Sequence, residues 1–153
     1  MTDSPALADP RLTDLQHEVI RHGPVASLKE AADARGLEPG AIIKTLVVRR
    51  GEDDYLFVLV PGDRSIAWPK LRKVLGVNRI SLPDADEAFA VTGYRRGTIT
   101  PFGASRTWPV VADSHLSERV SIGGGAQGVS LTVSAEDLIA VLQARRADVT
   151  EPV

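Results

Sequence analysis

Two apolar segments joined by a polar turn constrain the fold of this chain more than any other feature of the sequence. Residues 42–48 and residues 55–60 are both rich in β-branched and other apolar residues, which is typical of strands. Residues 51–54 between them hold one glycine and three acidic residues, a composition that favours a turn. The pattern therefore predicts a β-hairpin.

The rest of the chain mixes short helical and strand patterns without a regular βαβ rhythm, which indicates an α+β or mixed α/β domain. Apolar residues recur at helical spacing over residues 12–20, after Asp9-Pro10 and before Gly23-Pro24, so we predict a first helix there. Further helices are predicted at residues 27–36, 69–75, 84–91 and 134–146. Further strands are predicted at residues 77–82, 108–112, 119–122 and 129–133.

Length and composition indicate one soluble globular domain. The chain has 153 residues, of which 43% are hydrophobic and 25% are charged. We expect the domain at residues 10–147, with a flexible N-terminus at residues 1–9 and a flexible C-terminus at residues 148–153. The chain has no cysteine, which excludes disulfides and thiolate ligands for a metal.

Charge and hydropathy limit the partners that we expect. We expect no secretory signal and no membrane partner, because no apolar run approaches the roughly 20 residues of a membrane helix, and we expect a cytoplasmic protein. The net charge of −2 argues against a protein that coats DNA or other nucleic acid nonspecifically. Basic clusters at residues 49–50, 70–73 and 95–96 are either solvated surface charge or a local basic patch.

Lys44 is the most informative single residue. Strand alternation places it on one face with Ile42, Leu46 and Val48, all of them apolar. An unpaired ammonium taken out of water is costly, so this cation meets either solvent or an anion. A cleft that receives a phosphate or a carboxylate satisfies it. The alternative is a lysine that extends to water or guards a sheet edge.

Two glycine-rich segments are candidate anion sites. Residues 93–103 contain three glycines and one proline, and residues 123–128 contain four glycines. Glycine lets backbone N–H groups approach a ligand closely, which suits an oxyanion or a phosphate. Both segments are also compatible with ordinary turns, and neither matches a Walker or Rossmann fingerprint.

The histidines give no metal-site pattern. His17, His22 and His115 are scattered, without the spacing of metal ligands. Asp113 and His115 follow a predicted strand, a place where site residues often lie, but Asp-x-His by itself favours a capping role. A Gly-x-Ser-x-Gly elbow is absent from the sequence, so a serine hydrolase of that type has no support.

Taken together, these positions resemble the YbaK family of aminoacyl-tRNA deacylases, whose domain also occurs as the editing insertion of bacterial prolyl-tRNA synthetases. The resemblance extends in order over about residues 10–146. Its matching stretches are residues 43–47, 70–76, 92–94, 97–103, 109–113 and 123–128. It implies a mixed, partly closed β-sheet flanked by helices, with the site in a cleft.

The resemblance also implies a chemistry. The family removes a wrongly attached amino acid from tRNA through attack of a positioned water, without a metal, a cofactor or a covalent nucleophile. Lys44 matches the strand lysine of the family and would hold the terminal nucleotide, while backbone N–H groups near Gly97 would stabilise the carbonyl oxygen. Substrate-binding roles are implied for Thr45, Thr98, Pro101, Gly103, Asp113, Gly123, Gly124 and Gly125.

The identity of the removed amino acid stays open. Where the cysteine-removing branch has a serine just before its second-loop glycines, this chain has Gly123, with Ser121 close by. Alanine and cysteine, on tRNA-Pro among others, are therefore both candidates. An aminoacyl-tRNA synthetase is a further candidate partner. The alternative function is a module that binds a nucleotide or a tRNA 3′ end in the same cleft without cleaving it.

Overall fold

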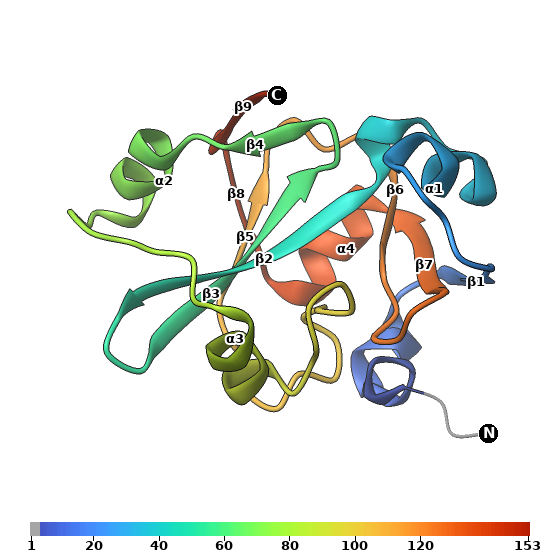
Figure 1. The fold of residues 1–153 in the computed structure, drawn as a ribbon, viewed down its shortest axis with the longest axis horizontal. Helices are drawn as coiled ribbons and strands as arrows, with labels where there is room; N and C mark the ends of the chain where they lie inside the picture. The colour runs from blue at the N-terminus through green and yellow to red at the C-terminus, as the bar shows by residue number, and fades with distance from the viewer. Residues whose placement is uncertain (1–3) are drawn as a thin grey trace.

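A computed structural model describes residues 4–153 and shows short helices packed around three small sheets (Figure 1). The α-helices are α1 (Leu28–Arg35), α2 (Trp68–Leu75), α3 (Ala85–Thr92) and α4 (Ala135–Leu142), and the 3₁₀ helices are η1 (Pro5–Ala8), η2 (Pro10–Asp14) and η3 (Pro39–Ala41). The strands are β1 (His17–Arg21), β2 (Ile43–Gly51), β3 (Asp54–Pro61), β4 (Arg64–Ile66), β5 (Val110–Asp113), β6 (Arg119–Gly123), β7 (Val129–Ser134), β8 (Arg145–Ala147) and β9 (Thr150–Pro152).

The central sheet has the strand order β2-β3-β5-β8 and is mixed. β2 and β3 pair antiparallel as the predicted hairpin, whereas β3–β5 and β5–β8 pair parallel. A second sheet, β1-β7-β6, is antiparallel, and β4 pairs with β9. A bridge between Ile42 and Ser121 joins the start of β2 to β6. The predicted α+β class is confirmed.

Both faces of the central sheet are buried. Every residue of β3 from Tyr55 to Pro61 is buried, as expected for a central strand. Phe57 and Leu59 pack into a core shared with β6, β7 and α4, while Val58 and Val60 pack on the other face. β2 forms the outer edge of this sheet, so its outer side is available to line a site.

Local capping signals place most helices correctly. The Ser27 hydroxyl accepts a hydrogen bond from the Glu30 N–H at the start of α1, and Asp84 and Ser134 cap α3 and α4 in the same way. Gly36 and Gly76 end α1 and α2 in the left-handed conformation. These predictions are confirmed because each depends on contacts within a few residues.

The predicted first helix is wrong. Residues 10–14 form only a short 3₁₀ helix, and His17–Arg21 is strand β1, paired with β7. Leu12 and Leu15 are buried, but Val19 is 39% exposed, so the helical periodicity does not continue into the core. Pairing with a distant strand satisfies the backbone here and overrides the local pattern.

Two further boundaries differ from prediction. Residues 77–82 form no strand, and Ser81 alone makes a bridge to Arg49. The last helix ends at Leu142 instead of residue 146, because Gln143 takes a left-handed conformation and residues 145–147 pair with β5 as β8.

The chain ends are more ordered than expected. Residues 150–152 form β9, and Val149 and Thr150 are fully buried, so the prediction of a flexible C-terminus is wrong for these residues. At the other end η1 buries Ala6 against the core. Residues 1–3 of the predicted flexible N-terminus lie outside the described residues. Within residues 4–153, none of the helices has the length and apolar character needed to span a bilayer.

Candidate functional site

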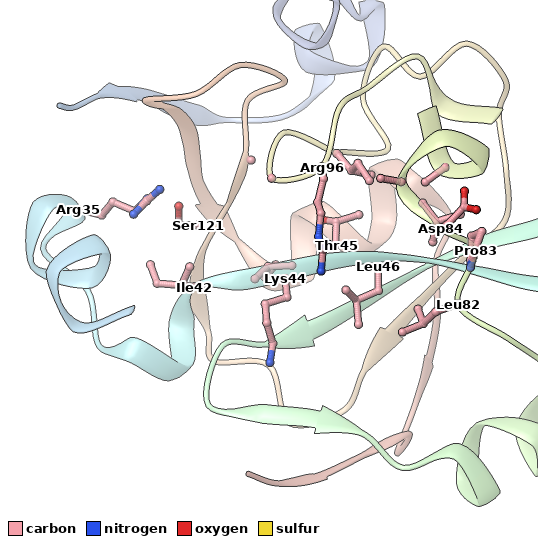
Figure 2. A pocket seen from close by; sticks show the side chains of 17 residues that line it. Arg35, Ile42, Lys44, Thr45, Leu46, Leu82, Pro83, Asp84, Arg96 and Ser121 are labelled. Carbon is pink, nitrogen blue, oxygen red and sulfur yellow. The ribbon is translucent and has the colours of Figure 1, made fainter. Parts of the chain in front are cut away.

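A cleft of about 720 Å³ runs along the outer edge of β2 (Figure 2). Its walls come from α1, the first half of β2, residues 82–88, the loop at residues 96–99, and β6. Four of the predicted site residues line it and come from three separate parts of the chain: Lys44, Thr45, Gly97 and Gly123.

The cleft lies where the outer edge of β2, the edge not paired with β3, has bridge partners only near its two ends. Ile42 bridges to Ser121 before the strand, and Arg49 bridges to Ser81 near its end. Between these bridges, no other described strand pairs with the outer edge of β2. An edge of this kind offers backbone N–H and C=O groups without strand partners, and residues 42–47 of this edge line the cleft.

Lys44 lies on one side of β2 and points toward β4 (Figure 2). Its ammonium donates a hydrogen bond to the backbone carbonyl of Arg64, and it shares its face with Leu46, which packs against the core as alternation predicts. Burial lowers the pKa of Lys44, and the negative charge of Asp63 opposes this shift. Its charge has no carboxylate in direct contact among the described residues, so an anion in the cleft would complement it.

Two arginines add positive charge to the cleft, and sequence analysis named neither as a site residue. Arg96 is exposed and reaches over Thr45 from above (Figure 2). Within the described chain, Arg96 forms no ion pair or side-chain hydrogen bond. Its position beside Gly97, in the basic pair 95–96, is a signal that could have found it.

Arg35 reaches the opposite end of the cleft from the last turn of α1. Its guanidinium donates to the hydroxyl of Ser130 and to the carbonyl of Ala31, and contacts Nε2 of His22. All three partners are hydrogen-bond acceptors without formal charge when His22 is neutral. Burial lowers the pKa of Arg35. No local sequence pattern distinguishes it from an ordinary basic residue at a helix C-terminus.

The loop at residues 95–99 brings Gly97 to the cleft. Gly97 has φ +88°, a left-handed conformation that favours glycine, and a Cβ there would meet open space. No hydrogen-bond acceptor for the Gly97 N–H exists within residues 4–153. Thr98 instead completes the turn, because both its N–H and its hydroxyl donate to the carbonyl of Arg95. Thr98 does not line the cleft.

Pro101 and Gly103 hold the N-terminal segment instead of the cleft. The carbonyl of Pro101 accepts a hydrogen bond from Arg11, and the N–H of Gly103 donates to Asp9. A Cβ on Gly103 would lie 2.4 Å from the backbone of Pro5, so this glycine permits close packing. Neither residue lines the cleft, and both anchor the segment of η1 and η2; their substrate-binding role stays a prediction.

The second glycine-rich loop divides in the same way. Gly123 lines the cleft two residues after Ser121, on the same side of β6. Gly124 instead accepts a hydrogen bond from Ser4 through its carbonyl, and Gly125 lies against Ala6. Neither Gly124 nor Gly125 lines the cleft, and their substrate-binding role stays a prediction.

Asp113 lies away from the cleft, at the end of β5, and is fully buried. One oxygen accepts a hydrogen bond from the Val149 N–H, and the other accepts from the Thr150 hydroxyl and from His115. Asp113 does not line the cleft, and its substrate-binding role stays a prediction. Its carboxylate instead fastens the C-terminal segment to the sheet, in the capping role that the sequence pattern favoured.

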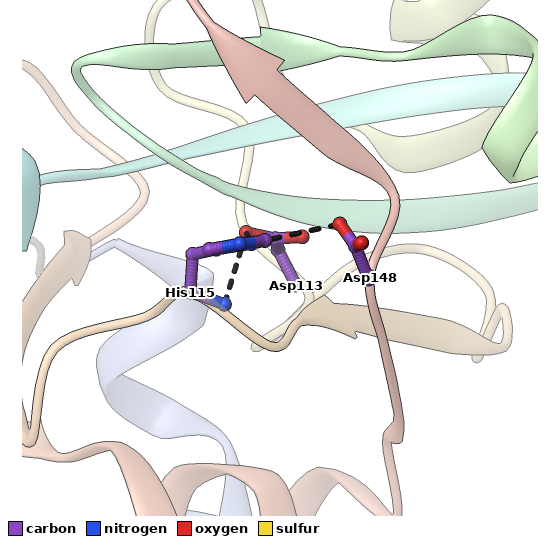
Figure 3. A group of neighbouring side chains, drawn as sticks. All are labelled: Asp113, His115 and Asp148. Atoms are coloured by element: carbon purple, nitrogen blue, oxygen red, sulfur yellow. Dashed lines mark hydrogen bonds and ion pairs between the residues drawn. The ribbon is translucent and has the colours of Figure 1, made fainter.

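A second group of charged side chains is close enough together to suggest a metal site (Figure 3). We call it the Asp113 cluster, and it consists of Asp113, His115 and Asp148. Their ligand atoms all lie within 4.8 Å of one another. Asp113 is already engaged by protein donors, however, and Asp148 pairs with Lys70 at 3.0 Å. The hydrogen bond from Lys70 lowers the pKa of Asp148. The donors already present explain this cluster as a fastening of the C-terminus.

A chain of hydrogen bonds connects the Asp113 cluster to the cleft. Thr150 donates to Asp113 and accepts from the guanidinium of Arg64 at 2.7 Å. The carbonyl of Arg64 in turn accepts from Lys44. The group that orients the cleft lysine is therefore tied to the buried carboxylate.

The sequence matches a known family along most of the cleft-forming region. The family model of the aminoacyl-tRNA editing domain matches residues 22–141. The chain belongs to this family. The resemblance found in the sequence is thereby confirmed, and the matched region contains every residue that lines the cleft.

Individual relatives agree with this membership. EbsC of Enterococcus faecalis, named for a proposed deacylase activity on Cys-tRNA(Pro) and Cys-tRNA(Cys), is 24% identical over 81% of this chain and 77% of its own length. The proline–tRNA ligase of Desulforamulus reducens is 30% identical over 77% of this chain, which matches only 20% of the ligase.

A solved structure has the same fold over nearly the whole chain. It is a candidate trans-editing enzyme for prolyl-tRNA synthetase, with a TM-score of 0.84 and 25% identity, and the match covers 99% of both chains. Editing domains of this family therefore occur both as separate proteins and within ligases, and the fold described above is the one they share.

Proposed function

We propose that this chain hydrolyses the ester of mischarged aminoacyl-tRNA, acting in trans on tRNA that a synthetase has released. The observation that carries the proposal is that Lys44, Arg96 and Gly97 all line one cleft beside the outer edge of β2, with Lys44 and Arg96 on opposite sides of the strand. Positive charge on both sides of the strand suits the anionic 3′ end of tRNA. Family membership supports the same substrate class.

The proposed chemistry uses a water molecule as the nucleophile. Lys44 and Arg96 hold the terminal nucleotide, which fixes the ester beside β2. Water attacks the carbonyl carbon, and the N–H of Gly97 donates a hydrogen bond to the oxygen as negative charge develops there. The ester C–O bond then breaks, which releases the amino acid and a tRNA with a free terminal hydroxyl.

A small amino acid is the proposed acyl group, and the terminal ribose oxygen of the tRNA, which takes up a proton, is the leaving group. The name of EbsC points to cysteine on tRNA-Pro, and the ligase match points to the same tRNA. The cysteine-removing branch has a serine at the position where this chain has Gly123. Both Gly123 and Ser121, two residues earlier on the same side of β6, line the cleft. Alanine and cysteine are therefore both candidates for the removed amino acid, and the experiment includes both. A cytoplasmic location and cooperation with a synthetase belong to the same proposal.

The experiment is a deacylation panel. The purified protein is incubated with Ala-tRNA(Pro), Cys-tRNA(Pro), Pro-tRNA(Pro) and Ala-tRNA(Ala), and the acylated fraction is followed with time. We expect hydrolysis of the first or second substrate and sparing of correctly charged tRNA. Failure to exceed the uncatalysed rate on every substrate would overturn the proposal.

Lys44→Ala serves as the matched inactive variant. We expect it to lose hydrolysis by about 100-fold or more, since a charge that positions the ester is removed. Its melting temperature should stay near that of the parent, because Lys44 makes only one hydrogen bond, to a backbone carbonyl. A parent that binds tRNA but releases no product, together with a Lys44→Ala variant that loses affinity only, would indicate a binding module instead of a hydrolase.

A further inference from the structure

A second hollow, of about 470 Å³, lies beside the cleft and is lined by four arginines. They come from two elements and one connecting segment: Arg49 and Arg50 of β2, Arg72 of α2, and Arg79 between α2 and α3. The other four lining residues carry no charge. The chain as a whole has a net charge of −2, so this concentration of cations is a local feature and not a consequence of overall composition.

Two of these arginines have no protein partner for their charge. Arg50 forms a two-fold hydrogen bond with Asp54, and Arg49 lies 3.7 Å from Glu87. For Arg72 and Arg79, the described part of the chain supplies neither an ion pair nor a side-chain hydrogen bond. Arg72 is half-buried in the last turn of α2, where the helix dipole favours a cation, but Arg79 is exposed and has no such explanation.

The arginine hollow continues directly from the cleft. β2 lines the cleft up to Val47 and the hollow from Arg49, and the segment after α2 lines the hollow at residues 78–81 and the cleft at residues 82–84. Two hydrogen bonds between Arg49 and Ser81, at 2.8 and 3.0 Å, join these two walls. Lys44 and Arg49 are five residues apart, which is about 17 Å along a strand.

We infer that the arginine hollow binds backbone phosphates of the tRNA acceptor arm while the acylated 3′ end occupies the cleft. The inference rests on the proposed function. Arginine suits this role because its planar guanidinium donates two parallel hydrogen bonds to a phosphate. Contacts of this kind position the nucleic acid without reading its sequence. The hollow therefore contributes to tRNA affinity and positions the acceptor arm, and hydrolysis of the ester takes place in the cleft.

The test compares two double variants that remove equal charge. Arg72→Ala/Arg79→Ala empties the hollow of its unpartnered cations. Arg145→Ala/Arg146→Ala removes two exposed arginines from β8, at the opposite edge of the same sheet. Binding of an uncharged tRNA-Pro transcript is measured between 50 and 200 mM salt, an interval over which about six phosphate contacts already change affinity strongly. Melting temperatures verify that both variants are folded.

We expect the hollow variant to bind tRNA about 10-fold more weakly and to lower the slope of log K against log salt by about 1–2, because each lost phosphate contact contributes about 0.7–0.9. The β8 variant should match the parent. Equal affinity and equal slope for the parent and the hollow variant would overturn the inference.

A short substrate separates this inference from the proposed function. Hydrolysis of an aminoacylated CCA trinucleotide, which has no stem to reach the hollow, should proceed at the same rate for the parent and the hollow variant. If the hollow variant slows the trinucleotide as much as it slows the tRNA, the arginines act on the cleft itself and the inference fails. If the parent hydrolyses no acylated RNA, the proposed function fails, while the binding data still decide whether the hollow contacts tRNA.

Discussion

The cleft and the Asp113 cluster both gather charged side chains beside the central sheet, but they differ in how those charges are satisfied. In the cluster, the buried carboxylate of Asp113 accepts hydrogen bonds from Val149, Thr150 and His115. In the cleft, Arg96 and the amide of Gly97 have no partner within the described residues. Buried polar groups that are fully bonded stabilise a fold, whereas exposed donors beside a cavity are free to bind a ligand.

The largest expected effect is on stability, from Asp113→Ala. Removing this carboxylate leaves two buried donors, the Val149 N–H and the Thr150 hydroxyl, without an acceptor, so we expect the free energy of unfolding to fall by about 3 kcal/mol. Urea unfolding measures the change, with Lys44→Ala as the matched substitution from the cleft, expected to cost less than about 1 kcal/mol. Equal losses for the two variants would erase the distinction between a structural and a functional charged group.

Gly97→Ala tests the role of the Gly97 backbone N–H in hydrolysis. A residue with a side chain is strained at this φ, and the amide is expected to move, so hydrolysis of the preferred tRNA should fall by about 10-fold to 100-fold. Gly76→Ala is the control, because Gly76 has φ +69° and equally open surroundings but ends α2, away from the cleft. A similar rate loss in both variants would show that strain alone, and not the amide of Gly97, is responsible.

Thr150→Val tests the link between the two regions. The substitution removes the hydroxyl that connects Arg64 to Asp113, so we expect a loss of stability of about 1–2 kcal/mol. Because the Arg64 carbonyl accepts from Lys44, the rate of hydrolysis should also fall a few-fold. Unfolding and deacylation assays on the same variant measure both. An unchanged rate of hydrolysis together with reduced stability would show that the Thr150 hydroxyl stabilises the fold but does not affect the cleft.

The smallest effect concerns Asp9, which anchors the N-terminal segment. Burial raises its pKa, but hydrogen bonds from Arg11 and Gly103 outweigh burial and lower the pKa to about 2. A carboxyl with a lowered pKa in the folded state stabilises the fold above its unfolded pKa of about 3.8, and this contribution is lost as the pH falls toward 2.

Unfolding of the parent and of Asp9→Asn at several pH values measures this contribution. We expect the parent to be the more stable protein at pH 7 and the difference to shrink between about pH 4 and pH 2. A difference that stays constant over this interval would show that the charge of Asp9 contributes nothing to stability.

Motif matching located the cleft but not all of its residues. Lys44, Thr45, Gly97 and Gly123 line it, and each lies in a segment that resembles the family. Pro101, Gly103, Gly124 and Gly125 belong to the same segments, yet they pack against residues 4–11. A glycine-rich motif predicts that the backbone approaches something closely, but the sequence does not say whether the neighbour is a ligand or another part of the chain.

The sequence by itself determined the β2–β3 hairpin, the caps of α1, α3 and α4, and the glycine ends of α1 and α2. The caps and glycine ends depend on residues within about four positions of one another, and the hairpin pairs two strands joined by a short turn, so local hydrogen bonds and backbone preferences decide these conformations. Tertiary structure alone decided that residues 17–21 form β1 and that Asp113 holds the C-terminus. It also decided that residues 145–147 pair with β5 and that residues 150–152 pair with β4. In each case the backbone or the carboxylate found its partners far away in the sequence, and burial made those partners necessary.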